Sequence, residues 1–80
     1  MKTITKEDIT NLRADFDKYT ETAEQHEFPM LAMVDIPFRK TIERIENGTY
    51  NIKKNQADLR AMFRCVLRVI GKDFSEYVEE

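Results

Sequence analysis

Cations, rather than nucleophiles, are the side chains best placed to do chemistry in this chain of 80 residues. Arg39, Lys40, Thr41 and Arg44 lie close together in a segment that we expect to be helical and to end at Gly48, because Gly reaches the left-handed conformation after a helix without steric penalty. Basic side chains in a first helical turn add to the positive potential of the helix N-terminus, which attracts anions such as nucleic-acid phosphates. The cluster therefore predicts a polyanion-binding helix, and the simpler interpretation is a solvated, charged helix face.

His26 and Cys65 are the only candidates for metal binding or nucleophilic chemistry. Neither has a partner in the sequence that would complete a site, so we expect an exposed connector histidine and a small residue near the edge of the core. No glycine-rich phosphate loop, pair of catalytic carboxylates or nucleophile with its base is evident. We therefore expect a protein that is not an enzyme and that needs no cofactor or metal. A single cysteine also excludes an intrachain disulfide and fits a reducing compartment.

The composition predicts one small cytoplasmic domain spanning residues 1–80. Hydrophobic residues make up 41% of the chain, enough for a single core at this length. No apolar run approaches about 18 residues and no signal-peptide pattern is present, so we expect no contact with a membrane. Residues 37–72 carry nine Lys or Arg and three Asp or Glu, whereas residues 1–36 carry four and eight. A local positive field steers polyanions even when the net charge is −2, although chance also produces uneven charge in short chains.

The apolar spacing predicts five short helices and no strands. Thr5 and Asp8 suggest an N-cap with a carboxylate three residues on, opening a helix that reaches the low twenties. Residues 20–27 lack an apolar period and are either a polar continuation of that helix or a connector. The other helices are expected at about 29–34, at about 37–47, from 57 or 58 to Gly71, and through Tyr77 and Val78, with a loop at 49–56 and with Met30, Met33 and Met62 as core fillers.

A short helix, a turn at residues 35–37 and a basic third helix together predict a helix-turn-helix. The segment Ile42-Glu43-Arg44-Ile45-Glu46-Asn47-Gly48 resembles the recognition-helix exit of the XRE family, the Cro and phage-repressor type of regulator. Leu31-Ala32, Leu12-Arg13 and the segment from Ile70 to Glu76 resemble further motifs of that family. The resemblance implies an all-α, lambda-repressor-like helix-turn-helix domain that binds DNA and represses transcription.

On this hypothesis the third helix enters the major groove of a double-stranded DNA operator, to which the protein binds as a homodimer. Arginine suits bidentate contact with guanine, and lysine suits contact with phosphate. Lysines in the loop that follows the third helix are expected to add contacts with the DNA backbone. The predicted DNA-binding residues are Arg39, Lys40, Thr41, Arg44, Lys53 and Lys54.

A protein-interaction module is the alternative function, in which the helix-turn-helix fold serves a small inhibitor or antitoxin-like factor that does not bind DNA. The acidic first helix favours this alternative, as does Glu27-Phe28 where the XRE family often has Ser-Gln. Arg60, Arg64 and Arg68 recur every four residues on the polar side of the fourth predicted helix. A solvated face is the simpler interpretation of that stripe, ahead of phosphate or partner binding.

Overall fold

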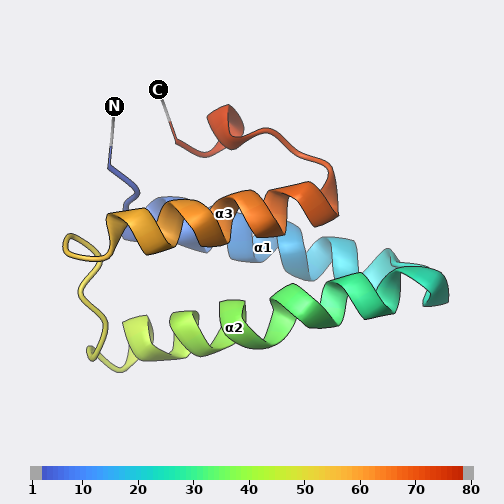
Figure 1. Ribbon diagram of the computed structural model, residues 1–80, viewed down its shortest axis with the longest axis horizontal. Helices are drawn as coiled ribbons and strands as arrows, with labels where there is room; N and C mark the ends of the chain where they lie inside the picture. Colours follow the sequence, from blue (N-terminus) through green and yellow to red (C-terminus); the bar gives the residue numbers. More distant parts are fainter. Residues whose placement is uncertain (1–2, 79–80) are drawn as a thin grey trace.

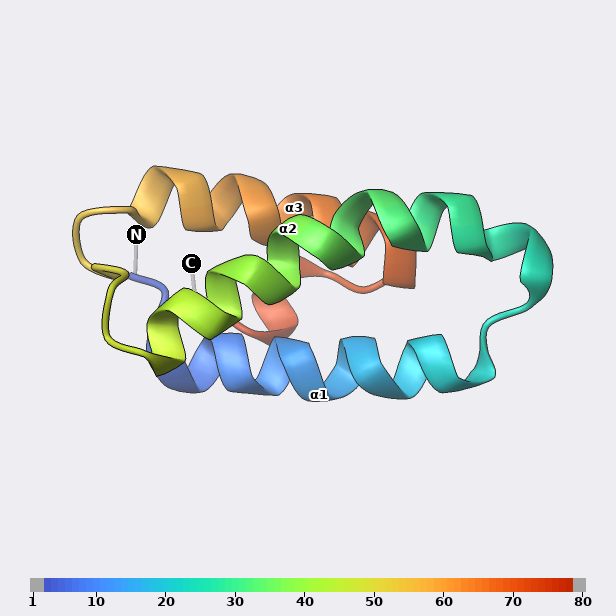
Figure 2. The same ribbon diagram turned by 90° about the horizontal axis from the view of Figure 1, so that it is seen from below.

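The computed structural model describes residues 3–78, and that part of the chain is helical without strands. Three α-helices form a bundle over this range: α1 (Lys6–Thr22), α2 (Phe28–Glu46) and α3 (Gln56–Ile70) (Figures 1 and 2). Two 3-10 turns accompany them: η1 (Gln25–Glu27) lies between α1 and α2, and η2 (Phe74–Glu76) follows α3. The helix α3 packs against both α1 and α2, so the core lies where the three helices meet.

The start of α1 is the predicted capping box. The Asp8 N–H donates to the Thr5 hydroxyl at 3.2 Å, and the Thr5 N–H donates to the Asp8 carboxylate at 2.9 Å. These two bonds satisfy backbone donors that the first turn of a helix leaves unpaired. The helix then buries Ile9, Leu12 and Phe16. Residues 20–27 were expected to be either a continuation of this helix or a connector, and they are both: α1 continues to Thr22, and a connector that contains η1 follows.

The prediction of five helices in a lambda-repressor-like helix-turn-helix is wrong for the described residues. The segments expected as a second helix, a turn and a third helix form one continuous helix, α2, with Pro37 inside it. The helix expected through Tyr77 and Val78 is the single 3-10 turn η2. Arg39 and Lys40 therefore lie in the middle of a long helix, and the argument from a basic first turn no longer applies.

Packing of the second half of α2 explains why the helix continues through Pro37. Phe38 is 0% exposed and meets the ring of Phe16 edge to face, with 5.4 Å between the ring centroids, and Ile42 is also buried. An interior proline costs about 3 kcal/mol, whereas burying one such large side chain contributes about 1.5 to 3 kcal/mol. Pro37 itself is exposed. Burial of Phe38 and Ile42 together outweighs the lost helical hydrogen bond.

The two helix stops at glycine are confirmed. Gly48 has φ 78° just after α2, and Gly71 has φ 71° just after α3, both in the left-handed region that glycine adopts without strain. Between α2 and α3, residues 47–55 form the loop that turns the chain back into α3. Gln56 fixes this corner through its side-chain amide, which accepts from the Ile4 N–H at 2.7 Å and donates to the carbonyls of Ile4 and Ile52, each at 2.9 Å.

The C-terminal segment closes the bundle over α1 and α3. The Tyr77 hydroxyl donates to the carboxylate of Asp15, and Val78 is buried in the core. Burial and this hydrogen bond raise the pKa of Tyr77 above its ordinary value. Phe74 packs against Phe63 of α3, with 6.0 Å between the ring centroids. Within the described residues, no helix is both long and apolar enough to cross a bilayer.

Replacing Pro37 by Ala tests the continuity of α2. Ala restores the N–H that can donate to the carbonyl of Met33, so the free energy of unfolding should rise by about 1 to 2 kcal/mol after allowance for the more flexible unfolded chain. Urea denaturation followed by circular dichroism measures the change. Pro29→Ala is the matched control, because Pro29 lies in the first turn of α2, and it should change stability by less than about 0.5 kcal/mol. An unchanged or lowered stability of Pro37→Ala would indicate a turn at residues 35–37.

Candidate functional site

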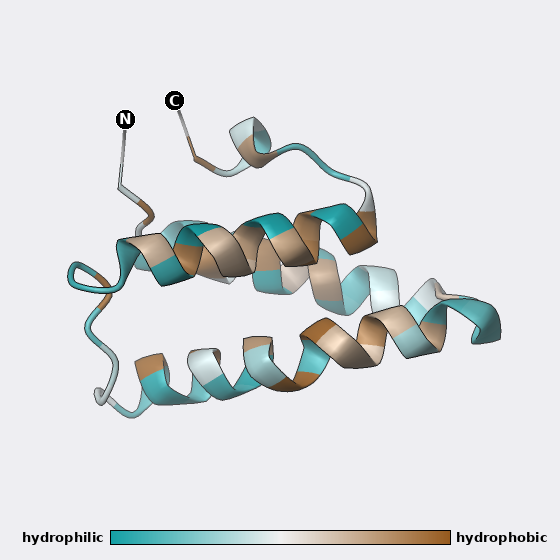
Figure 3. Ribbon diagram, viewed as in Figure 1, coloured by the Kyte–Doolittle hydropathy of each residue, from teal (hydrophilic) through white to brown (hydrophobic). Residues whose placement is uncertain are grey.

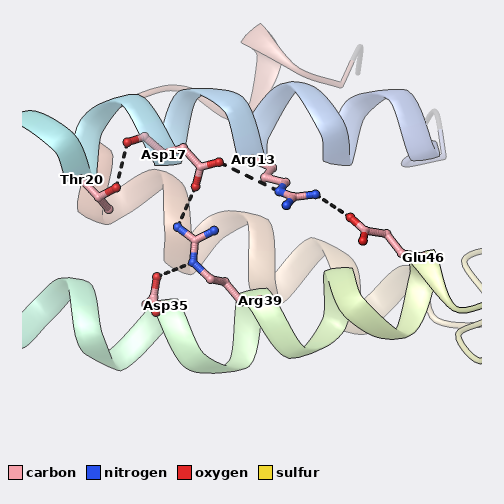
Figure 4. Close-up of polar contacts among 6 residues, drawn as sticks. All are labelled: Arg13, Asp17, Thr20, Asp35, Arg39 and Glu46. Carbon is pink, nitrogen blue, oxygen red and sulfur yellow. Dashed lines mark hydrogen bonds and ion pairs between the residues drawn. The ribbon is translucent and has the colours of Figure 1, made fainter.

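Arg39, one of the two arginines predicted to contact guanine, points toward α1 (Figure 4). Its Nη2 lies 2.6 Å from the Asp17 carboxylate and its Nε lies 2.8 Å from the Asp35 carboxylate. Its guanidinium also lies over the ring of Phe16, 5.5 Å from the centroid. The hydrogen bond with Asp17, followed by that with Asp35, raises the pKa of Arg39 above its ordinary value. Arg39 thus holds α2 against α1.

Arg13 adds further ion pairs between the same two helices, α1 and α2. From α1 it contacts Glu46 at the end of α2, at 2.5 Å, and it approaches Asp17 at 4.0 Å (Figure 4). Asp17 therefore lies between two guanidinium groups. All of these side chains are about 40% exposed or more, so water screens the pairs and each contributes modestly to stability.

The other predicted DNA-binding residues remain on the surface, toward the loop that follows α2. Lys40 and Arg44 are exposed and four residues apart, so they share one side of the helix. Arg44 lies over the ring of Tyr50, 5.7 Å from its centroid. Thr41 is half-buried and donates its hydroxyl to the Pro37 carbonyl at 3.0 Å. The loop adds two exposed cations, Lys53 and Lys54.

Neither His26 nor Cys65 takes part in a metal cluster, and no group of three or more His, Cys, Asp or Glu among residues 3–78 is placed to hold a metal ion. His26 is exposed in η1, with its Nδ1 3.4 Å from the Glu24 carboxylate. Cys65 is a free thiol and is exposed on α3.

The prediction that Met30 and Met33 fill the core is not met, because both side chains are exposed on α2. Met33 is 77% exposed, Ile36 is 61% exposed and Met30 is 55% exposed. Phe28 at the start of the same helix is 51% exposed. Figure 3 shows that apolar residues are concentrated in the first half of α2. Contiguous exposed apolar surface of this kind is typical of protein, membrane or ligand contact sites.

An apolar hollow of about 310 Å³ lies between these methionines and α3. We call it the α2–α3 groove. It is lined by Met30, Met33 and Val34 from α2, and by Arg64, Cys65, Arg68 and Val69 from α3. Thus the groove combines apolar walls, a thiol and two arginines along one edge.

The groove depends on a feature of α2 that was not expected from the sequence. Leu31, Phe38 and Ile42 are its buried residues, and in an uninterrupted helix their spacing defines a single buried face. Met30 and Met33 fall off that face. Leu31, Phe38 and Ile42 keep the same helical period on both sides of Pro37, and this is the sequence signal that could have revealed the exposed methionines.

No protein-family model matches the chain, and neither a curated protein nor a solved structure is significantly similar to it. The resemblance to the XRE family therefore rests on short sequence motifs alone. The helix-turn-helix that this resemblance implied is absent from residues 3–78.

The position of Arg39 predicts a role in stability, which can be measured independently of any DNA binding. Arg39→Ala removes both ion pairs and the contact with Phe16. We expect the free energy of unfolding to fall by only about 1 to 2 kcal/mol, because water screens ion pairs that are partly exposed. Lys40→Ala, one residue along and exposed, should change it by less than about 0.5 kcal/mol. Thermal and urea unfolding of the two variants give the comparison. Equal stability of both variants would contradict a role of Arg39 in joining α1 to α2.

Proposed function

We propose that this protein is a protein-interaction module whose α2–α3 groove binds an amphipathic helix of a partner protein. One observation carries the proposal: Met30, Met33 and Ile36 remain exposed on a single helix beside an apolar hollow. Burying such side chains contributes about 1.5 to 3 kcal/mol each, and a core this small does not use them. Methionine is flexible and polarizable, which suits a surface that must fit the side chains of another protein.

The shape of the site favours a helix as the occupant. Its walls are two neighbouring helices, α2 and α3, so a third helix can lay an apolar stripe between them in the manner of helix-in-groove recognition. Residues 3–78 contain no sheet edge to which an extended peptide could add a strand. A small molecule fits less well, because about 310 Å³ is at the lower limit of ligand pockets and Met33 extends into solvent.

Two displayed libraries of 18-residue peptides test this proposal. One fixes an apolar stripe at helical spacing and randomises the flanks; the other has the same composition in scrambled order. We expect binders from the first library only. Bound peptide should also slow the reaction of Cys65 with a thiol reagent, because this residue is the only cysteine of the chain and lines the groove.

Met33→Glu is the decisive variant, and Ala14→Glu on the exposed side of α1 is its matched control. Because Met33 is 77% exposed, the charge should leave the fold intact while placing a carboxylate in the apolar contact. We expect peptide binding to weaken at least about tenfold, equivalent to about 1.4 kcal/mol, with the control unchanged. Binders that leave Cys65 reactive, or that bind both variants equally, would show that the groove is not the site.

We infer DNA binding as a second candidate function from four exposed cations at the other end of α2. Lys40, Arg44, Lys53 and Lys54 lie on the last turns of α2 and in the following loop. Within residues 3–78, no carboxylate lies within ion-pair distance of these four side chains. On a duplex they would chiefly contact phosphates, with Arg44 suited to guanine and with two copies needed for useful affinity.

Salt dependence tests this second candidate. Each phosphate contact contributes about 0.9 to the slope of log affinity against log salt, so replacing both Lys53 and Lys54 by Ala should lower the slope by about two. Fluorescence anisotropy with labelled duplexes at several salt concentrations measures it. The control replaces Lys6 and Lys18 of α1 by Ala and should leave the slope unchanged. Absence of binding by the unmodified protein at low salt would exclude this function.

A further inference from the structure

Two arginines form the α3 edge of the apolar groove. Arg64 and Arg68 are exposed and line the same hollow as Met30, Met33 and Val34. They are four residues apart on α3, which places them on the same side of the helix and about 6 Å apart along its axis. Any helix seated in the groove would therefore pass beside two positive charges separated by one helical turn.

Among residues 3–78, Arg64 and Arg68 have no acidic partner, as is also true of the four cations at the far end of α2 and in the loop after it. Arg13, Arg39 and Lys72 all lie within 4.0 Å of carboxylates. For Arg64 and Arg68, no carboxylate of residues 3–78 comes within that distance. The groove is thus apolar along its walls and electropositive along one edge.

The guanidinium group of Arg64 is positioned before any partner arrives. It lies over the ring of Phe74, 5.2 Å from the centroid, and Phe74 in turn packs against Phe63 of the core. A guanidinium group held by an aromatic face keeps its N–H edges available for bidentate bonds to a carboxylate. Positioning of this kind reduces the conformational entropy lost on binding.

From this geometry we propose that the partner helix is acidic along one flank, with two carboxylates one turn apart that pair with Arg64 and Arg68. Its apolar stripe lies against Met30, Met33 and Val69, and its acidic residues sit at i and i+4, or i and i+3, beside that stripe. The inference rests on the proposed function above and adds the chemistry of the partner. A helix with basic residues on that flank would be repelled by the same two arginines.

Three 18-residue peptides that share one apolar stripe test the inference on the full chain. They differ only at the two flank positions, which carry Glu and Glu, Gln and Gln, or Lys and Lys. By fluorescence anisotropy at low salt, we expect the Glu peptide to bind at least about tenfold more tightly than the Gln peptide, and the Lys peptide to bind most weakly. High salt should narrow these differences.

Charge reversal of the protein supplies the decisive comparison. Replacing both Arg64 and Arg68 by Glu should invert the order, so that the Lys peptide binds most tightly. Replacing Lys6 and Lys18 of α1 by Glu makes the same change in net charge away from the groove and should preserve the original order. Because Arg64 contacts Phe74, Arg68→Glu alone serves as a second variant that leaves this contact in place, and it should by itself reduce the preference for the Glu peptide.

The outcomes separate the two proposals. If all three peptides bind equally and Arg68→Glu changes nothing, the groove is a docking site without charge preference and the acidic partner is overturned. If no peptide with the stripe binds or protects Cys65, the proposed function fails as well. If sedimentation shows a dimer in which Cys65 is protected without peptide, the occupant is a second copy of the chain, and the acidic partner helix is overturned.

Discussion

The contact between Phe38 and Phe16 is the interaction on which the arrangement of this bundle depends. Both rings are fully buried, and they meet edge to face between α1 and α2. An aromatic pair of this geometry contributes about 0.5 to 1.5 kcal/mol beyond the burial of its area. This contact fixes the rotation of α2 about its axis after Pro37, and Leu31 fixes the same rotation before it. One buried face therefore runs through the proline.

The exposed surface of α2 follows directly from that rotation. Once Leu31, Phe38 and Ile42 face inward, Met33 and Ile36 must face solvent, because they lie on the other side of the same helix. The second half of α2 is tied to α1 by Arg39 and Arg13, whereas the first half borders the groove beside α3. The two ends of one helix thus serve different purposes, holding the bundle together at one end and offering an apolar surface at the other.

Local signals in the sequence predicted local structure well. The Thr5–Asp8 capping box, the left-handed glycines at 48 and 71 and the apolar face of α3 all follow from interactions between residues a few positions apart. The prediction of a turn at residues 35–37 was wrong. Proline and the residue before it disfavour a helix locally, whereas the packing that maintains the helix is that of Phe38 on Phe16, more than 20 positions away in the sequence. The bonds of Gln56 to Ile4, 52 positions apart, could not be read from the sequence for the same reason.

The candidate sites show why charge alone is a weak guide to function. Arg39, Arg64 and Arg68 occur in similar sequence surroundings, because each lies on a polar side of an amphipathic helix. They differ in the side chains that the fold places beside them. Arg39 meets two carboxylates and an aromatic ring, so its charge is satisfied within the bundle. Arg64 and Arg68 meet an apolar hollow and no carboxylate of residues 3–78. A charge without an acidic partner next to unburied apolar area is the combination that a second protein can complete, because one helix supplies both the apolar side chains and the carboxylates.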